Sequence, residues 1–118
     1  MAGEMILVVE DNEKNRKLVR DVLQHKGYDV IGSETGEDGV RLAKERQPRL
    51  VLMDINGIEA LHRLRADETT RAIPVIAVTA SALDRDRQKI MAAGFDGYQA
   101  KPLNVKAFMA AVDAVFGR

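Results

Sequence analysis

Short apolar runs recur along the chain at nearly even spacing. Three of them are continuous, at residues 5–9, 50–53 and 75–78. Unbroken apolar runs of this length are typical of strands that are buried on both faces, as in a parallel sheet. Two weaker segments, 28–31 and 97–100, fit the same rhythm, and we predict strands there too, with 28–31 nearer an edge of the sheet.

The intervals between these strands carry apolar residues at helical spacing. In the first interval, Leu18, Val19, Val22 and Leu23 form one apolar group, which favours an amphipathic helix. The predicted helices cover residues 13–26, 37–46, 58–66, 83–93 and 105–116.

Two residues mark the ends of the first predicted helix, because Asn12 can cap its start and Gly27 lies at the usual glycine position after a helix end. The last two helices carry Ile90 with Met91, and Val105 with Phe108. The strict alternation of strand and helix predicts an α/β fold with one parallel sheet, right-handed crossovers and helices on both faces. We expect residues 1–118 to form a single domain.

Composition narrows the possible classes of function. Lys plus Arg and Asp plus Glu are both 18, so the formal net charge is zero, which argues against a nucleic-acid-binding protein. The chain has no cysteine, which excludes disulfides, thiol catalysis and thiolate metal sites. No apolar run approaches the roughly 20 residues that span a bilayer, and no signal peptide precedes the first strand. We therefore expect a cytoplasmic domain with no membrane or nucleic-acid partner.

Chemically useful side chains follow the predicted strands. Glu10 and Asp11 come after the first strand, Asp54 after the third, Thr79 after the fourth and Lys101 after the fifth. Each alone is typical of a helix cap or turn. In a doubly wound sheet, however, the carboxyl ends of the strands form the ligand site. Three carboxylates, a hydroxyl and an ammonium group are therefore expected at one edge.

Such a cluster has a definite chemistry. Carboxylates placed together repel one another unless a cation offsets their charge, and Mg²⁺ prefers oxygen ligands. A carboxylate beside Mg²⁺ can attack phosphorus and form an aspartyl phosphate. An ammonium group and a hydroxyl would then stabilise the charge on the phosphoryl oxygens.

Four motifs in this order resemble the receiver domain of response regulators in two-component signalling. They are Val-Val-Glu-Asp-Asn at 8–12, Val-Leu-Met-Asp at 51–54, Val-Thr-Ala at 78–80 and Ala-Lys-Pro-Leu at 100–103. The first and last are most similar to single-domain cell-division-control regulators or to hybrid-kinase receivers. The resemblance implies a flavodoxin-like (βα)5 doubly wound fold, a five-stranded parallel sheet with strand order 2-1-3-4-5.

The resemblance also implies a role for each residue at the strand ends. Asp54 would be the phospho-acceptor, Asp11 would bind Mg²⁺ directly and Glu10 would bind it through water. Thr79 would be the switch hydroxyl, and Lys101 would pair with the phosphate.

Two more positions follow from the family pattern. Tyr98 lies at the aromatic switch position, although a half-buried strand tyrosine is the alternative interpretation, and the peptide before Pro102 would be cis. A histidine kinase or histidine phosphotransferase would donate the phosphoryl group. A downstream protein would bind the face formed by 83–93, 97–100 and 105–116. Such a domain is a signalling switch that catalyses its own phosphorylation and dephosphorylation rather than a turnover enzyme.

The chain departs from the family pattern directly after Asp54, where several residues and a proline are missing before Gly57. Counting forward assigns the metal-binding backbone carbonyl to Asn56, but aligning backward from Gly57 assigns it differently. Either the connection is truly short and alters the metal site, or loop residues are absent from this sequence. Consecutive Cα atoms about 3.8 Å apart through this stretch would exclude the second explanation.

Two other functions remain as alternatives. The short connection favours a pseudo-receiver, a binding module of the same fold that no longer accepts phosphate. A flavodoxin-like flavoprotein would share the strand and helix order. The acidic stretch 10–12 argues against the flavoprotein, because it would repel a cofactor phosphate.

Overall fold

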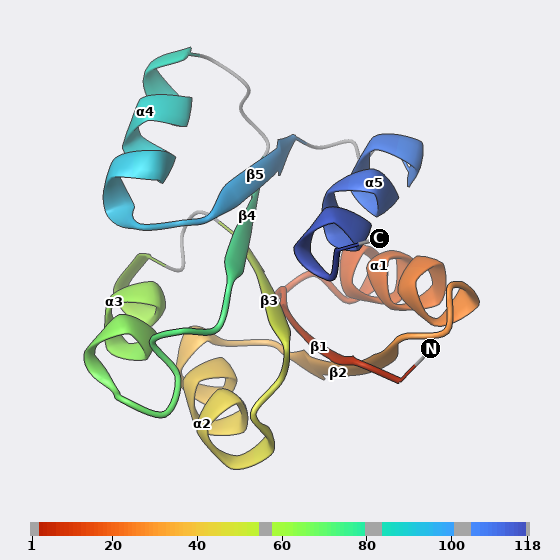
Figure 1. Ribbon diagram of the computed structural model, residues 1–118, viewed down its shortest axis with the longest axis horizontal. Helices are drawn as coiled ribbons and strands as arrows, with labels where there is room; N and C mark the ends of the chain where they lie inside the picture. Colours follow the sequence, from red (N-terminus) through yellow and green to blue (C-terminus); the bar gives the residue numbers. More distant parts are fainter. Residues whose placement is uncertain (1–2, 55–57, 80–83, 101–104, 118) are drawn as a thin grey trace.

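The chain forms one twisted sheet with helices on both faces (Figure 1). The computed structural model describes residues 3–54, 58–79, 84–100 and 105–117, with side chains left out at 79, 84–87 and 100. Strands and helices alternate from the first element to the last as β1 Met5–Val9, α1 Glu13–His25, β2 Asp29–Ser33, α2 Gly36–Arg46, β3 Leu50–Asp54, α3 Ile58–Ala66, β4 Val75–Thr79, α4 Asp84–Ala93, β5 Gly97–Ala100 and α5 Val105–Val115.

All strands are parallel and lie in the order β2-β1-β3-β4-β5. The flavodoxin-like fold and its strand order are therefore confirmed, and β2 is an edge strand as predicted. Helices α1 and α5 cover one face of the sheet, while α2 and α3 cover the other (Figure 1). The central strand β3 pairs with β1 on one side and β4 on the other, so a side chain that follows β3 lies in the middle of the edge.

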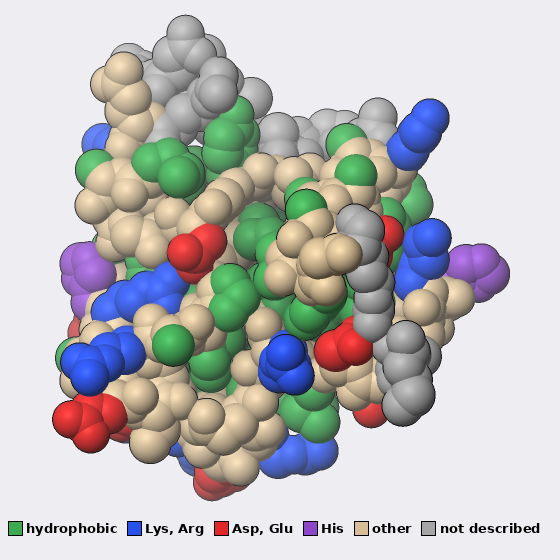
Figure 2. Space-filling view, viewed as in Figure 1, with side chains coloured by type: hydrophobic (Ala, Val, Ile, Leu, Met, Phe, Trp, Pro, Cys, Tyr) green, Lys and Arg blue, Asp and Glu red, His purple; other side chains and the backbone are tan. Residues whose placement is uncertain are grey.

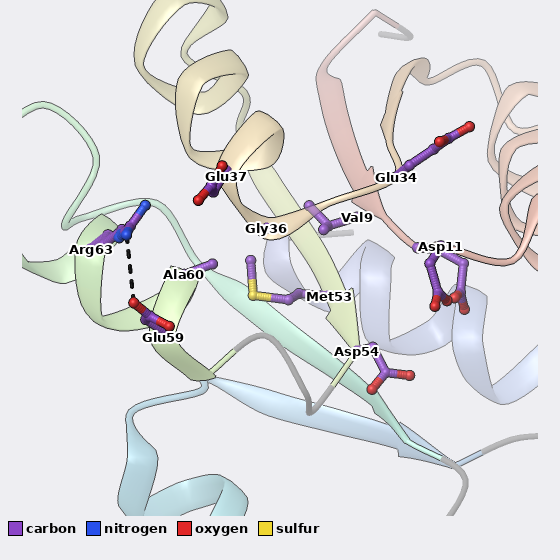
Figure 3. Close-up of a pocket in the computed structure, with 11 residues that line it drawn as sticks. Val9, Asp11, Glu34, Gly36, Glu37, Met53, Asp54, Glu59, Ala60 and Arg63 are labelled. Atoms are coloured by element: carbon purple, nitrogen blue, oxygen red, sulfur yellow. Dashed lines mark hydrogen bonds and ion pairs between the residues drawn. The ribbon is translucent and has the colours of Figure 1, made fainter.

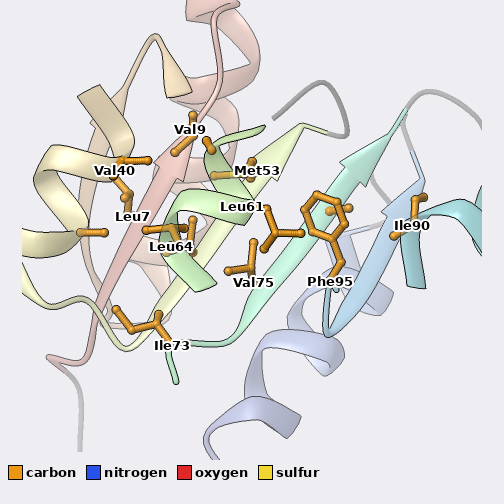
Figure 4. Packing of buried hydrophobic residues seen from close by; sticks show 14 residues of the cluster. Leu7, Val9, Val40, Met53, Leu61, Leu64, Ile73, Val75, Ile90 and Phe95 are labelled. Atoms are coloured by element: carbon orange, nitrogen blue, oxygen red, sulfur yellow. The ribbon is translucent and has the colours of Figure 1, made fainter. Parts of the chain in front are cut away.

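Alternation along the strands divides the core into two layers. Ile6 and Val8 of β1 face the helices α1 and α5, whereas Leu7 and Val9 face α2 and α3, because successive strand residues point to opposite faces. Figure 4 shows the second layer, in which Leu61 packs near strand β4. Burying a Leu or Ile fully contributes about 1.5–3 kcal/mol, so these layers are the main source of stability.

Three apolar helix residues lie outside both layers, which corrects the predicted apolar groups. Leu18 and Met91 are each 51% exposed and Val105 is 49% exposed. On α1 the buried stripe consists of Val19 and Leu23, four residues apart, and Leu18 is rotated to the flank of that stripe.

The local signals at α1 act as predicted. The Asn15 amide donates to the Asn12 side chain at 3.0 Å, which caps the helix, and Gly27 has the positive φ of 93° expected after a helix end. Strand β2 begins at Asp29 rather than Tyr28. Tyr28 is nevertheless buried, because its hydroxyl donates to Asp113 at 2.8 Å and its ring packs on Phe116.

Gly39 of α2 lies against the end of β1. A Cβ added at Gly39 would come within 2.7 Å of a Val9 methyl group, closer than side chains normally pack. The absence of a side chain therefore allows α2 to approach the strand that leads into Glu10.

The opposite, amino-terminal edge of the sheet is closed by Arg65 at the end of α3. Its guanidinium donates to the carbonyls of Ile73 at 2.7 Å and Gly94 at 3.2 Å, and to Asp96 Oδ2 at 2.7 Å. The same Asp96 oxygen accepts from the Val75 amide at 2.8 Å, at the start of β4. One side chain thus joins α3, β4 and the turn before β5.

The outer surface carries both signs of charge. Lys and Arg side chains are interspersed with Asp and Glu side chains over the face drawn in Figure 2, in keeping with the net charge of zero. His25 and His62 are both exposed, as expected for isolated helix histidines. None of the helices in the described ranges has the length and apolar character that a membrane crossing requires.

Candidate functional site

Carboxylates from two neighbouring strands meet at the carboxyl edge of the sheet. Strand register pairs Val9 with Met53, so the residues that follow them, Glu10 and Asp54, leave β1 and β3 at the same level. Asp11 comes one residue later in the β1–α1 turn. The predicted convergence of these carboxylates follows from parallel pairing alone.

A cleft of about 320 Å³ opens at this edge. In Figure 3, Asp11 and Asp54 lie at one side of it and Glu59 and Arg63 at the other. Its walls come from the ends of β1 and β3 and the first turns of α2 and α3, and consist of Val9, Glu10, Asp11, Glu34, Gly36, Glu37, Met53, Asp54, Glu59, Ala60 and Arg63. The cleft is therefore strongly acidic, with Arg63 as the cation in its described lining.

The far wall of the cleft was not predicted from the sequence. Glu59 and Arg63 are one helical turn apart on α3 and form an ion pair at 3.5 Å. Both side chains are largely exposed, so the pair adds little stability. They lie beside the site because α3 begins only four residues after Asp54, and a count along the chain could have indicated this.

The backbone around Asp11 is held by several hydrogen bonds. The Glu10 amide donates to the Ser33 carbonyl at 2.9 Å, and the Asn12 amide donates to Glu10 Oε2 at 3.2 Å. Arg16 donates to the Glu10 carbonyl at 2.7 Å. Glu10 is only 7% exposed, whereas Asp11 is exposed and Asp54 is partly exposed. Asp11 and Asp54 are therefore the carboxylates most open to an incoming ion.

The oxygen donors of the cleft fit a magnesium ion that is held by few protein ligands and several waters. Among the described residues, no group of three or more carboxylate or histidine side chains is arranged to hold an ion by itself. Mg²⁺ usually keeps several waters and takes only one or two carboxylates. Asp11 and Asp54 are two such carboxylates, and Glu10 lines the cleft beside them. The chemistry of the site thus fits Mg²⁺ with few direct protein ligands.

A smaller apolar cavity of about 170 Å³ lies on the α1 side of Asp54. Its wall is formed by β1, β3, β4 and α1, through Val8, Val9, Glu10, Asn15, Leu18, Val19, Leu52, Met53, Asp54 and Val78. The half-exposed Leu18 belongs to this wall. Leu18, the apolar residue of α1 that lies outside the core, is therefore next to the candidate site.

The remaining predicted site residues are placed only in part. Thr79 ends β4, and its backbone pairs with Ala100 of β5. Tyr98 is in β5, opposite Ala77, and is partly buried, which fits both the switch interpretation and the structural one. Asn56, Lys101 and Pro102 lie outside the described residues, as do the predicted cis peptide and the Cα spacing after Asp54.

The sequence matches the family model described as response regulator receiver domain over residues 6–113. Among curated proteins, it is 40% identical to the polar-differentiation response regulator DivK of Brucella ovis in an alignment of 117 positions that covers 95% of each chain. The same identity and coverage are found with DivK of Brucella abortus.

Solved structures of similar shape agree with this match. The receiver domain of sensor histidine kinase PA1611 from Pseudomonas aeruginosa, with a magnesium ion coordinated in its active site cleft, has a TM-score of 0.90 and 34% identity, and the match covers 99% of this chain and 100% of that one. The chemotaxis protein CheY4 of Vibrio cholerae has a TM-score of 0.89 with 24% identity, covering 97% and 99% of the two chains, and shares the fold.

Proposed function

This chain belongs to the response regulator receiver family, and from that premise we propose that phosphorylation of Asp54 operates it as a switch. Receiver domains of response regulators are signalling switches rather than turnover enzymes. The observation that carries the proposal is that Asp54, at the end of the central strand β3, shares one cleft with Glu10 and Asp11.

The transfer step is a displacement at phosphorus. A carboxylate oxygen of Asp54 attacks the phosphorus of a phosphohistidine, and a new oxygen–phosphorus bond forms as the nitrogen–phosphorus bond breaks. The bonding electron pair stays on the imidazole nitrogen of the donor, which then takes up a proton. Asp54 suits this role because its side chain is only partly buried and faces the open cleft.

Asp11 and Asp54 would hold Mg²⁺, and Glu10 would contact it through water. When bound, the ion would offset negative charge on the phosphoryl oxygens. We assign to Lys101 the pairing with the phosphate and to Thr79 the hydroxyl that follows the phosphoryl group. Asn56 remains our candidate for a backbone carbonyl ligand. These three assignments rest on the family pattern.

The readout surface that we propose is the α4–β5–α5 face. Exposed apolar side chains on both helices support it, Met91 on α4 and Val105 on α5. Tyr98 of the intervening β5 would move between two positions when Thr79 shifts, which changes the surface that a downstream protein meets.

We place the phosphodonor, a histidine kinase or histidine phosphotransferase, over α1. Leu18 supports this placement, because an apolar side chain 51% exposed beside Asp54 suits contact with a helix of a partner. Leu18→Asp is expected to slow transfer from a phosphorylated histidine phosphotransferase domain more than tenfold while leaving labelling by a small phosphodonor unchanged. Equal slowing with both donors would contradict the placement.

Intact mass tests the central proposal directly. The protein is incubated with acetyl phosphate and Mg²⁺, and the wild type is expected to gain one phosphoryl group. Asp54→Asn should gain none, whereas the matched control Asp29→Asn, at an exposed aspartate of β2, should label normally. A wild type of unchanged mass that still binds a kinase or an output partner would instead support the pseudo-receiver.

Family membership shows that the flavoprotein alternative is wrong. The pseudo-receiver alternative rested on the short connection after Asp54, and residues 55–57 of that connection lie outside the described part of the chain. The cleft beside Asp54 retains its acidic residues, which favours the phosphorylated switch.

A further inference from the structure

Arg16 reaches from the first turns of α1 back to the end of β1. Its amide donates to the Asn12 carbonyl at 2.9 Å within the helix, and its guanidinium Nη1 donates to the Glu10 carbonyl at 2.7 Å. Nη2 lies 3.5 Å from Glu34 Oε1 in the β2–α2 connection. The side chain is only 20% exposed, so it is largely enclosed between these elements.

The carbonyl that Arg16 binds belongs to the peptide between Glu10 and Asp11. Hydrogen bonds donated by the Glu10 amide to the Ser33 carbonyl and by the Asn12 amide to Glu10 Oε2 hold the groups on either side. A charge-assisted bond to the Glu10 carbonyl restricts rotation of this peptide, from which the Asp11 side chain projects. Because Arg16 acts through a neutral carbonyl, its hydrogen bond does not occupy a carboxylate oxygen of Glu10, Asp11 or Asp54.

A second strand supports the same arrangement. A Cβ added at Gly32 of β2 would lie 3.0 Å from Arg16 Cδ, and 3.6 Å from both Cγ and Nε. Gly32 has no positive φ that would require glycine, and glycine weakens a strand interior. We infer that glycine is present here because it leaves space for the Arg16 side chain.

We propose that Arg16 is a positioning residue for the magnesium site, and that Gly32 provides the channel in which it lies. The inference rests on the proposed function. Arg16 sets the orientation of Asp11 relative to Asp54 before the ion arrives. A guanidinium suits this task because its planar fork can reach the carbonyl and Glu34 together, which a lysine ammonium cannot do.

Calorimetric titration with Mg²⁺ alone tests the proposal. Arg16→Met keeps the apolar stem and removes the donors, and we expect it to weaken Mg²⁺ binding roughly tenfold or more, the usual effect of losing a group that orients a metal ligand. Arg16→Lys should restore part of the affinity. Glu34→Gln should weaken Mg²⁺ binding less than Arg16→Met does, because that ion pair is long and Glu34 is 75% exposed.

Two further variants separate positioning from general stability. Arg20→Met removes an equal charge from the exposed side of α1 and should leave both Mg²⁺ affinity and the Asp11 amide resonance unchanged. Gly32→Val displaces Arg16 while supplying a residue that strands favour, so it should weaken Mg²⁺ binding in a protein that remains folded. Arg16→Met should also move the Asp11 amide resonance in the metal-free protein.

The outcomes distinguish this inference from the function on which it rests. Normal Mg²⁺ affinity in both Arg16→Met and Gly32→Val would overturn the role of Arg16 and leave the phosphorylation proposal standing. If Arg16→Met does not fold, Gly32→Val alone decides in the same way. A wild type that neither binds Mg²⁺ nor accepts phosphate would overturn both.

Discussion

The two edges of the sheet treat charge in opposite ways. At the amino-terminal edge, Arg65 meets backbone carbonyls and Asp96, and Asp96 also accepts from a strand amide. At the carboxyl-terminal edge, Glu10, Asp11 and Asp54 line one cleft. At one edge a guanidinium meets hydrogen-bond acceptors, and at the other several carboxylates lie together and repel one another.

This difference indicates which edge serves stability and which serves chemistry. A matched network inside one fold contributes to the free energy of unfolding, whereas gathered carboxylates lower it until a cation arrives. Functional sites are commonly the places where stability is sacrificed. The comparison can be tested by removing the matched network, by adding the cation, by neutralising one carboxylate and by changing pH.

The largest expected effect comes from Arg65. Arg65→Met removes the guanidinium donor from the carbonyls of Ile73 and Gly94 and leaves Asp96 with the Val75 amide alone, and should lower the free energy of unfolding by about 3 kcal/mol in urea titration. Phosphorylation of the folded fraction should persist, because this edge lies away from Asp54.

Arg41→Met is the matched control for Arg65. Arg41 pairs with Asp38 and Glu45 on the exposed side of α2, and these carboxylates raise the pKa of its guanidinium. A guanidinium is already fully charged at neutral pH, so this shift has no effect there. The control should change stability far less than Arg65→Met does, because its ion pairs are exposed to solvent. Equal losses in the two variants would contradict the importance of the Arg65 network.

Magnesium should offset the repulsion at the other edge. At a concentration a hundredfold above its dissociation constant, an ion that binds only the folded state raises the free energy of unfolding by about 2.7 kcal/mol. Thermal unfolding with Mg²⁺, and again after addition of a chelator, should show this rise and its reversal. The control is NaCl, free of divalent cations, at the same ionic strength. An equal rise in the free energy of unfolding with NaCl would indicate that salt merely screens the repulsion between the carboxylates.

Asp54→Asn should produce a smaller effect of the same origin. Without metal, removing one charge from the cleft should raise the free energy of unfolding by about 1 kcal/mol or less, the scale of a close charge pair in water. The variant should then gain less than the wild type from Mg²⁺. Destabilisation of metal-free Asp54→Asn would mean that the favourable contacts of the carboxylate outweigh its repulsion by Glu10 and Asp11.

The smallest effect concerns Asp67, which follows α3. The Thr69 hydroxyl and amide, with Lys44 nearby, lower the pKa of Asp67. A carboxyl whose pKa is lower in the folded state stabilises the fold above its unfolded pKa and loses that contribution as pH falls through the folded value. Asp67→Asn should therefore be less stable than the wild type at pH 7, and the difference should shrink below about pH 4 in urea titrations.

Much of the fold and part of the site could be predicted from the sequence. The apolar run at 5–9 was enough to predict strand β1. The positions of Glu10 and Asp54 after predicted strands were enough to predict that their carboxylates meet, because residues that follow parallel strands lie at the same edge of the sheet. The exposed Leu18 could not be assigned, since its neighbour Val19 satisfies the same helical period.

The roles of Arg16 and Arg65 left no comparable signal. Each acts through backbone carbonyls outside its own helix, and a carbonyl has no sequence signature because every residue carries one. The role of Gly32 could not be predicted from the sequence either, because it depends on the Arg16 side chain lying against it in the structure.

Gly39 shows how far such an effect can reach. The smallest possible substitution, Gly39→Ala, would press on Val9 and so disturb the residue directly before Glu10. In a saturation-mutagenesis screen scored by signalling output, we expect this position to tolerate almost nothing, as a nucleophile would. Gly39 would then score as intolerant of substitution as Asp54, although its only contribution is that it has no side chain to collide with Val9.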